Sequence, residues 1–511
     1  MNNIFKTLLG AGFAIAVAFY VQSTFSHVPN VGFLMMAAVF GAYMAMNIGA
    51  NDVANNVGPA VGAGALTIGG AIVIASIFEA AGALIAGGDV VKTIKKGIVD
   101  PVAFAGDPMI FVYAMAAALL AAALWLTLAT TLKAPVSTTH SIVGGVMGAG
   151  IAAGGFAVVS WVTMGKIAMS WVISPVLGGL IAAGFLYIIK SQIVHKEDRL
   201  EAAKKVVPIL VSVMAMAFIT YLTVKGLKKV WPDIVDLLPF LPDTKKPSIQ
   251  IALLFGFIGS LITYSIVRPR VNTKVQSLNN DRASINTLFT IPLIFAAALL
   301  SFAHGANDVA NAVGPLAAIY DSLANTTISA KAAIPLWVMI VGGLGISIGL
   351  ALFGPRLIKT VGTEITELDQ MRAFSIMMAA AITVVIASQL GLPVSSTHIA
   401  VGGVFGVGFL REWIDRNASS ENHEALNSQQ AVVDGYKAEL ETVGEDYKRK
   451  VELLEIIKVE KKSAKQIKKA LRENYVKRGM VKKIITAWII TVPVAALLSA
   501  MIFFVIKGVG I

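Results

Sequence analysis

Cysteine is absent from this sequence, and charged residues are scarce. None of the 511 residues is Cys and only 14% are charged, whereas 56% are hydrophobic and the mean hydropathy is +0.75. The absence of Cys excludes disulfides and thiolate metal sites, and it leaves the compartment open. The scarcity of charge excludes a soluble globular domain, so we predict an all-α polytopic membrane protein.

The apolar runs are long enough to cross a bilayer many times. Runs of roughly 17 to 25 residues predict about 12 to 13 transmembrane helices, two or more of them broken or re-entrant. The first run, near residues 8–24, follows a single Lys and precedes no A-x-A-like cleavage site. We therefore expect a retained first span rather than a signal peptide.

The Lys and Arg residues predict the orientation. A formal net charge of +12 would favour a nucleic-acid partner in a soluble protein. In a membrane protein it indicates basic cytoplasmic loops, so we expect no nucleic acid. The preferred orientation, in the cell (inner) membrane, places the N-terminus and the segment 413–483 in the cytoplasm. It leaves two basic groups outside, which are Lys92, Lys95 and Lys96, and Lys225, Lys228 and Lys229.

Two motifs occur twice. NIGANDVANNVGP at 47–59 returns as AHGANDVANAVGP at 303–315, and APVSTTHSIVGGVMGAG at 134–150 returns as LPVSSTHIAVGGVFGVG at 392–408. The offsets of 256 and 258 residues are nearly equal, and an odd number of predicted spans separates the copies. This pattern predicts inverted repeats, as in many secondary transporters. The predicted parts are an N-terminal span 1–31, transport repeats 32–160 and 287–412 separated by linking spans and a loop 161–286, a charged cytoplasmic helical segment 413–483, and a C-terminal span 484–511.

The first motif carries a carboxylate into the apolar interior. An Asp at the centre of a membrane helix costs roughly 2.5 to 3.5 kcal/mol, so Asp52 and Asp308 are expected to face a cavity and to have a function. Carboxylate and amide oxygens suit a hard cation such as Na⁺ better than zinc. Gly49 and Gly305 are expected to let the helices unwind and free carbonyl groups. The predicted Na⁺ ligands are Asn51, Asp52, Asn55, Glu79, Asn307, Asp308 and Asn311.

Glu79 is the least certain member of that set because it has no acidic counterpart in the second copy. The alternative to a cation ligand is a structural acid near the site.

The second motif supplies hydrogen-bond donors. Pro135 and Pro393 suit the first turn of a helix, whose free N–H groups attract anions. Hydroxyl groups follow at once, so two helix N-termini that meet at the midplane would bind an oxyanion without Arg. The predicted anion-binding residues are Asp52, Ser137, Thr138, Thr139, Asp308, Ser395, Ser396 and Thr397.

Charge balance favours movement of an anion together with cations. A like-charged pair about 5 Å apart repels by roughly 3 kcal/mol at an effective dielectric constant of about 20, so two aspartates and an anion need cations beside them. We therefore predict symport and no enzymatic activity. An intramembrane aspartyl protease would need a proton shared over a scissile bond, and no protease pattern surrounds these aspartates.

Simpler structural explanations exist for each motif. The Asn-Asp pairs are alternatively an interhelical clamp, and the Ser/Thr runs alternatively bond the backbone and pack helices. His140 and His398, which close the second motif, are either proton carriers or partners of neighbouring carbonyls.

The segment 413–483 differs from the rest of the chain. Its stretches, such as YKRKVELLEIIKVEKKSAKQIKKALREN, are rich in charge of both signs, and Ile467 and Leu471 repeat at helical spacing. We expect a cytoplasmic helical hairpin. It is either a solvated helix pair that docks on the bundle or on anionic lipid, or a regulatory or partner-binding element.

The copies GANDVANNVGP, PVSTTH, GANDVANAVGP and PVSSTH resemble the signatures of the inorganic phosphate transporter (PiT) family of sodium- or proton-coupled phosphate permeases. The resemblance covers both repeats but neither the charged segment nor the last span. It implies an inverted-repeat symporter, usually dimeric, that carries phosphate with Na⁺, with H⁺ or as metal-phosphate. It also implies that the polar residues of these motifs line the site and that Glu79 matches the family's mid-span acid.

The prediction is inward symport of inorganic phosphate with Na⁺, by a homodimer in membrane lipid that needs no cofactor. Phosphate keeps an O–H near neutral pH that a carboxylate accepts, whereas sulfate has none, so two aspartates favour phosphate. The alternatives are H⁺-coupled phosphate or metal-phosphate transport, and sulfate transport by a protein of the same family.

Overall fold

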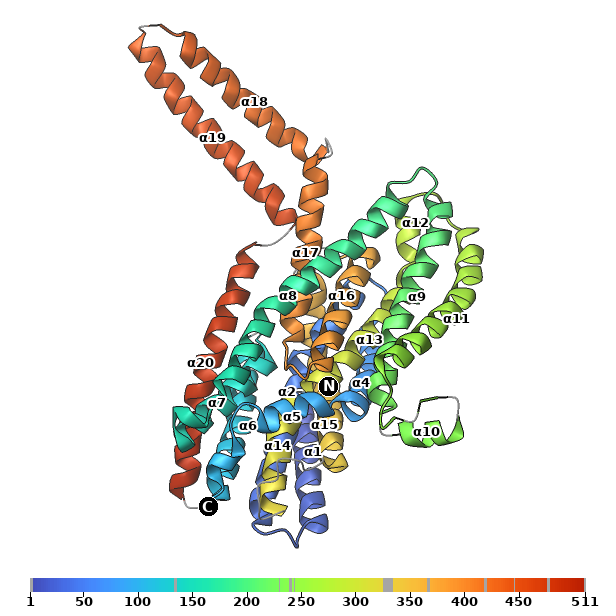
Figure 1. Ribbon diagram of the computed structural model, residues 1–511. Helices are drawn as coiled ribbons and strands as arrows, with labels where there is room; N and C mark the ends of the chain where they lie inside the picture. The colour runs from blue at the N-terminus through green and yellow to red at the C-terminus, as the bar shows by residue number, and fades with distance from the viewer. Residues whose placement is uncertain are drawn as a thin grey trace.

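The computed structural model is built from helices (Figure 1). It describes residues 3–132, 136–228, 230–238, 241–242, 244–324, 334–364, 368–417, 421–444, 446–475 and 478–509. Pro135, expected to begin a helix, lies outside these ranges. The helices are α1 Asn3–Thr24, α2 Val31–Asn51, α3 Val53–Gly62, α4 Ile68–Ala86, α5 Gly88–Lys96, α6 Pro108–Thr131, α7 Thr138–Gly154, α8 Trp161–Ile189, α9 Arg199–Gly226, α10 Trp231–Leu237, α11 Ile249–Val275, α12 Arg282–Thr287, α13 Thr290–Asp308, α14 Ala310–Ala324, α15 Leu336–Glu364, α16 Gln370–Gln389, α17 Ser396–Asn417, α18 Glu421–Thr442, α19 Tyr447–Tyr475 and α20 Arg478–Val509.

The chain is a multi-pass membrane protein. Within the described ranges, eleven helices are long and apolar enough to cross a membrane. The spans expected near 136–156 and 394–410 form α7 and α17, which are not among those eleven. The two first-motif copies lie inside the longest apolar stretches of the N-terminal and central parts, Val31–Gly62 and Arg282–Ala324.

Each copy of the first motif lies where one helix gives way to the next. Helices α2 and α3 meet at Asp52, and α13 and α14 meet at Val309. The expectation that the helices unwind at Gly49 and Gly305 is wrong, because both glycines are helical. A Cβ at Gly49 would overlap a carbonyl oxygen of α15, and one at Gly305 would overlap a carbonyl oxygen of α4. The glycines therefore allow close helix packing.

Corresponding helices of the two halves make corresponding contacts. Helix α2 packs on α15, and α13 packs on α4. Helix α8, which follows α7, packs on α17, whereas α20 packs on α7. Helices of the first half therefore pack on helices of the second half, and the contacts are made by corresponding helices. The opposite membrane orientation of the two copies and the division into six parts stay predictions.

The two lysine groups that the predicted orientation places outside the cell lie near each other in the structure. Asp89 of α5 forms ion pairs with Lys225 and Lys228 near the end of α9, and Lys95 of α5 lies 3.0 Å from the carboxylate of Asp321 on α14. Partial burial favours the neutral carboxyl, but the hydrogen bond and charge of Lys225 outweigh it and hold the pKa of Asp89 below its usual value. Acidic neighbours therefore offset these lysines, which weakens the objection to the orientation.

The charged segment forms the expected helical hairpin. Helices α18 and α19 lie side by side and project from the bundle, at the end that also holds the α8–α9 turn (Figure 1). Val433, Leu453 and Ile457 are buried in the pair, and Arg449 bonds Glu439 across it at 2.7 Å. The cytoplasmic location of the hairpin stays a prediction.

Candidate functional site

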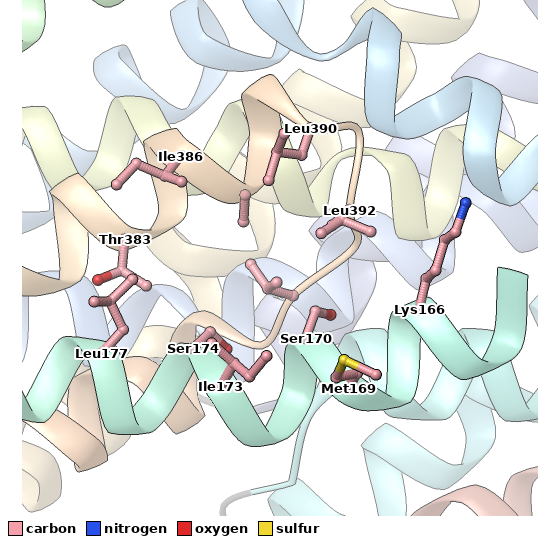
Figure 2. Close-up of a pocket in the computed structure, with 12 residues that line it drawn as sticks. Lys166, Met169, Ser170, Ile173, Ser174, Leu177, Thr383, Ile386, Leu390 and Leu392 are labelled. Carbon is pink, nitrogen blue, oxygen red and sulfur yellow. The ribbon is translucent and has the colours of Figure 1, made fainter.

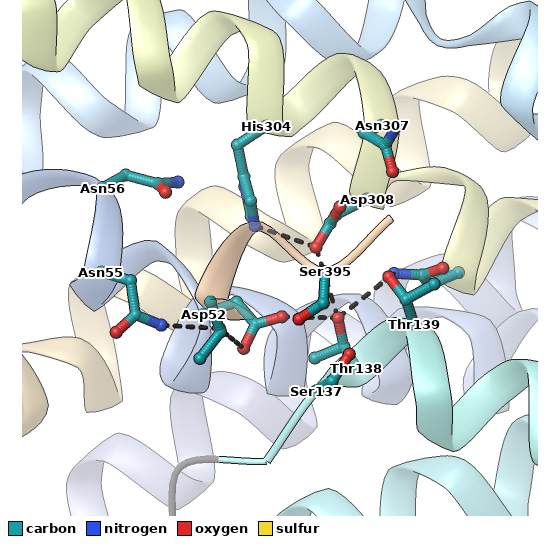
Figure 3. Close-up of polar contacts among 12 residues, drawn as sticks. Asp52, Asn55, Asn56, Ser137, Thr138, Thr139, His304, Asn307, Asp308 and Ser395 are labelled. Atoms are coloured by element: carbon teal, nitrogen blue, oxygen red, sulfur yellow. Dashed lines mark hydrogen bonds and ion pairs between the residues drawn. The ribbon is translucent and has the colours of Figure 1, made fainter. Parts of the chain in front are cut away.

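Asp52 and Asp308 lie together inside the bundle, at the two helix breaks (Figure 3). Oγ1 of Thr138 is 2.6 Å from Oδ2 of Asp52 and 3.4 Å from Oδ2 of Asp308. The exposed fractions of the two aspartates are 1% and 0%. Two carboxylates from different halves of the chain therefore share one buried site.

The N-termini of α7 and α17 meet at this site. Thr138 of α7 and Thr397 of α17 both donate to Asp52, the second at 3.1 Å. Ser137 and Ser395 cap the two helices, because their hydroxyl oxygens accept from backbone N–H groups three residues on. The capping serines keep only their hydroxyl protons for an anion, while the first-turn amides stay directed at the site.

The inner asparagines of the first motif bind the second motif of the opposite half. Nδ2 of Asn55 donates to Thr397 at 2.8 Å, and Nδ2 of Asn311 lies 3.2 Å from Thr138 and 3.1 Å from Thr139. The equivalent residues thus make equivalent crossed contacts. Sequence spacing alone predicted that these residues share a site but not that each asparagine reaches the other half.

Several oxygen atoms at the site have no hydrogen-bond donor. Oδ1 of Asp308 and Oδ1 of Asn311 are buried without a partner in the described part of the chain. Because proline has no N–H, Pro59 and Pro315 deprive the backbone carbonyls of Asn55 and Asn311 of their helical donors. Unpaired oxygens beside carboxylates are suited to a hard cation.

The outer asparagines point to neighbouring helices. Asn51 donates to Thr130 of α6 at 2.8 Å, and Asn307 donates to Ser388 of α16 at 2.9 Å. Oδ1 of Asn307 also accepts from the backbone N–H of Val394 at 3.2 Å. These two amides, predicted as cation ligands, are used here to fix the helices around the aspartates.

Sequence reasoning missed His304. Its Nδ1 lies 2.7 Å from Oε2 of Glu79, and its Nε2 lies 3.0 Å from Oδ2 of Asp308. Asn56 donates to the other oxygen of Glu79 at 2.8 Å. Both oxygens of Glu79 are thus engaged, and in this arrangement the carboxylate orients His304.

A signal for the His304–Glu79 pair was present in the sequence. The equivalent positions of the other half are Ile48 and Ile346, both fully buried. Asn56 likewise has an apolar counterpart, Ala312, and it is the third member of this contact group. The polar residues that break the repeat's symmetry here therefore contact one another.

One ligand atom each from Asp52, His304 and Asp308 lie within 4.8 Å of one another. The cation set expected from the sequence contained no imidazole, and the structure adds one. Carboxylate and amide oxygens favour Na⁺, whereas an imidazole also suits transition metals.

The imidazole rings of the two second-motif histidines meet edge to face. The ring centroids of His140 and His398 are 4.4 Å apart, and Trp171 and Trp488 cover their outer faces at 3.8 and 3.5 Å. None of their ring nitrogens has a hydrogen-bond partner in the described ranges. The suggestion that they bond neighbouring carbonyls is therefore wrong.

A groove of about 420 Å³ lies between α8 and α16, beside the site (Figure 2). Its lining is mostly apolar, with Ser170, Ser174, Thr383 and Lys166 as exceptions. No predicted site residue lines it, and an apolar wall does not stabilise a hydrated anion. The buried aspartate site, rather than this groove, is the candidate for ion binding.

Comparisons with known proteins identify the family. The model of the phosphate transporter family matches residues 48–499. The chain belongs to the phosphate transporter family. It is 51% identical over 489 residues to a "Putative phosphate permease" of Helicobacter pylori, which covers 92% of this chain and 89% of the relative. It is 34% identical to a protein of the same description from Pyrococcus abyssi, over 93% of this chain and 98% of that one.

A solved structure described as the sodium-dependent phosphate transporter has 33% identity to this chain and a TM-score of 0.75, covering 94% of this chain and 100% of that one. The phosphate transporter family match includes all four motif copies, the hairpin α18–α19 and most of α20. The parts that the motif resemblance left uncovered therefore belong to the matched region as well.

Proposed function

We propose that this protein moves inorganic phosphate into the cell by symport with Na⁺. The observation that carries the proposal is the meeting of Asp52 and Asp308, one from each half, with hydroxyl groups of both second-motif copies in one buried site. Membership of the phosphate transporter family supports the substrate, and the sodium-dependent structural neighbour supports the coupling ion.

The aspartates and the unpaired oxygens around them provide the cation sites in this proposal. One oxygen of each carboxylate lies within 4.8 Å of the other, so two ionised carboxylates repel by at least about 3.5 kcal/mol at an effective dielectric constant of about 20. Na⁺ ions beside Asp52 and Asp308, with Oδ1 of Asn311 and the carbonyl of Asn55 as further ligands, offset that repulsion. Asn51, Asn307 and Glu79 then hold these ligands in place.

Phosphate takes its donors from the N-termini of α7 and α17. Oγ of Ser396 is buried without a partner in the described residues, and Thr138 and Thr397 donate to Asp52. Phosphate competes for those hydroxyl groups while Na⁺ takes their place on the carboxylate. Anion and cation thereby favour each other's binding. A carboxylate without Na⁺ accepts the phosphate O–H, which sulfate lacks.

H⁺-coupled transport is the second candidate, and the His304–Glu79 contact favours it. The 2.7 Å separation of Nδ1 and Oε2 holds a proton between imidazole and carboxylate, and Asp308 lies at the other ring nitrogen. The same imidazole favours metal-phosphate as a related cargo.

The proposed transport cycle uses the two halves as inverted repeats. The site is buried from both sides, and relative movement of the halves would open it to one side at a time. Insertion in the inner membrane and assembly as a homodimer are parts of this proposal.

Labelled phosphate uptake into proteoliposomes tests the proposal. An inward Na⁺ gradient and an inward H⁺ gradient are compared at matched membrane potential, with unlabelled phosphate or sulfate as competitor. Uptake driven by Na⁺ and blocked only by phosphate supports the proposal. Uptake driven only by H⁺ would indicate that coupling depends on the His304–Glu79 pair. Inhibition of phosphate uptake by sulfate would indicate that the protein also binds sulfate.

A further inference from the structure

The outer face of α19 carries a continuous row of lysines. We define the lysine face as Lys458, Lys461, Lys462, Lys465, Lys468 and Lys469. At 3.6 residues per turn these positions fall within an arc of about 120° and extend along the helix for about 17 Å. All six side chains are exposed. On the side of α19 that adjoins this arc, Leu453 and Ile457 are buried against α18.

Five of the six lysines of the face have no acidic partner among the described residues. Glu460 is the only acid between residues 458 and 469, and it bonds Gln429 of α18. Carboxylates of the described residues form no ion pair with Lys458, Lys461, Lys462, Lys465 or Lys468. In contrast, Arg449 near the tip of the hairpin pairs with Glu439 and Glu452. The positive charge is therefore concentrated on the half of α19 that is nearer the membrane domain.

The position of this face points to the bilayer as its partner. Helix α19 ends at Tyr475, and α20, which begins at Arg478, crosses the membrane from Ile485. In Figure 1 the hairpin leans over the α20 side of the bundle, with α19 as the helix nearer α20. Farther along the same face, Tyr447, Val451 and Leu454 are exposed apolar side chains. A basic helix face with apolar neighbours matches an anionic lipid surface.

We propose that α19 docks through its lysine face on the anionic lipid headgroups around its own membrane domain. The helices on either side of the hairpin reach the site. Helix α17 begins at Ser396 beside Thr397, and α20 packs on α7. Docking therefore anchors two helices whose contacts define the site.

Site-specific fluorescence on the full-length protein tests the proposal, because a chain without Cys accepts one label without background. Gln466→Cys places a dye beside the lysine face on an exposed position. The protein is placed in nanodiscs of phosphatidylcholine alone or mixed with phosphatidylglycerol, each with a nitroxide-headgroup lipid as quencher. Docking predicts strong quenching only with phosphatidylglycerol, reversed by high salt.

The decisive variant removes three lysines of the face, K461Q/K465Q/K468Q. Because each lysine near an anionic surface contributes about a five-fold factor in binding, removing three should lower the equilibrium constant for docking by roughly 100-fold and abolish most of the quenching. K437Q/K448Q removes lysines of the hairpin that lie outside the arc of the face and should retain the quenching. Equal quenching in both nanodiscs, or full quenching in the first variant, overturns the proposal. The absence of quenching in both nanodiscs also overturns the proposal. The lysine face would then contact solvent or an acidic protein instead of lipid.

Discussion

Replacing Asp308 by Asn should have opposite effects on stability without and with Na⁺. One atom each of Asp52, His304 and Asp308 lie within 4.8 Å of one another, so the two ionised carboxylates repel by at least about 3.5 kcal/mol at an effective dielectric constant of about 20. Asp308→Asn removes that repulsion and a cation ligand together. In Na⁺-free buffer the variant should therefore unfold at a higher temperature than the wild type. Na⁺ should then raise the unfolding temperature of the wild type only.

The assay is thermal unfolding of purified protein in detergent, with NaCl replaced by choline chloride at constant ionic strength. At a Na⁺ concentration about 100 times its dissociation constant, binding stabilises the wild type by about 2.7 kcal/mol. Asp107→Asn is the matched control, because Asp107 caps α6 by accepting from Met109 N–H and Asn caps equally well. A full Na⁺ shift in Asp308→Asn, or a variant less stable than wild type in choline, would refute the reasoning.

Three other perturbations test the structure around the site. Lys95→Met should destabilise by about 3 to 5 kcal/mol in thermal unfolding, because it removes the ammonium from a buried ion pair, and adding Asp321→Leu should recover most of the loss. Asp89, whose pKa is lowered, stabilises the fold above the usual carboxyl pKa and loses that contribution as pH falls through its lowered pKa. Asp89→Asn should therefore flatten the acid side of the stability–pH curve, and an unchanged curve would contradict the ion pairs. Gly49→Ala should separate α2 from α15 and reduce both stability and uptake, whereas Gly12→Ala, whose Cβ meets nothing within 4 Å, should leave both near wild type.

The repeated motifs were enough to predict that their aspartates and hydroxyl groups lie together, whereas ion binding by these residues stays a prediction. An aspartate in an apolar run has few stable environments, and its repetition with an amide and a hydroxyl run predicted one shared polar centre. The structure brings Asp52, Asp308, Thr138 and Thr397 together as that reasoning required. Helical content and the hairpin followed from apolar length and charge pattern in the same way.

The sequence did not predict which neighbouring helix each polar side chain of the motifs contacts. Asn51 and Asn55 stand on the same motif, yet one reaches α6 and the other reaches Thr397 of the opposite half. Which amide faces the aspartates depends on how four helices pack, and no local pattern encodes it. His304 was missed although its lack of a polar counterpart in the other half is visible in the sequence, because its partner Glu79 lies 225 residues away and no local pattern joins the two.

The most direct test of the central claim is equilibrium binding of labelled phosphate to the purified protein, with and without Na⁺ at constant ionic strength. If two carboxylates border the phosphate site, Na⁺ must raise the phosphate affinity, and phosphate must raise the Na⁺ affinity by the same factor. Phosphate affinity that is unchanged by Na⁺ would contradict a shared site at Asp52 and Asp308.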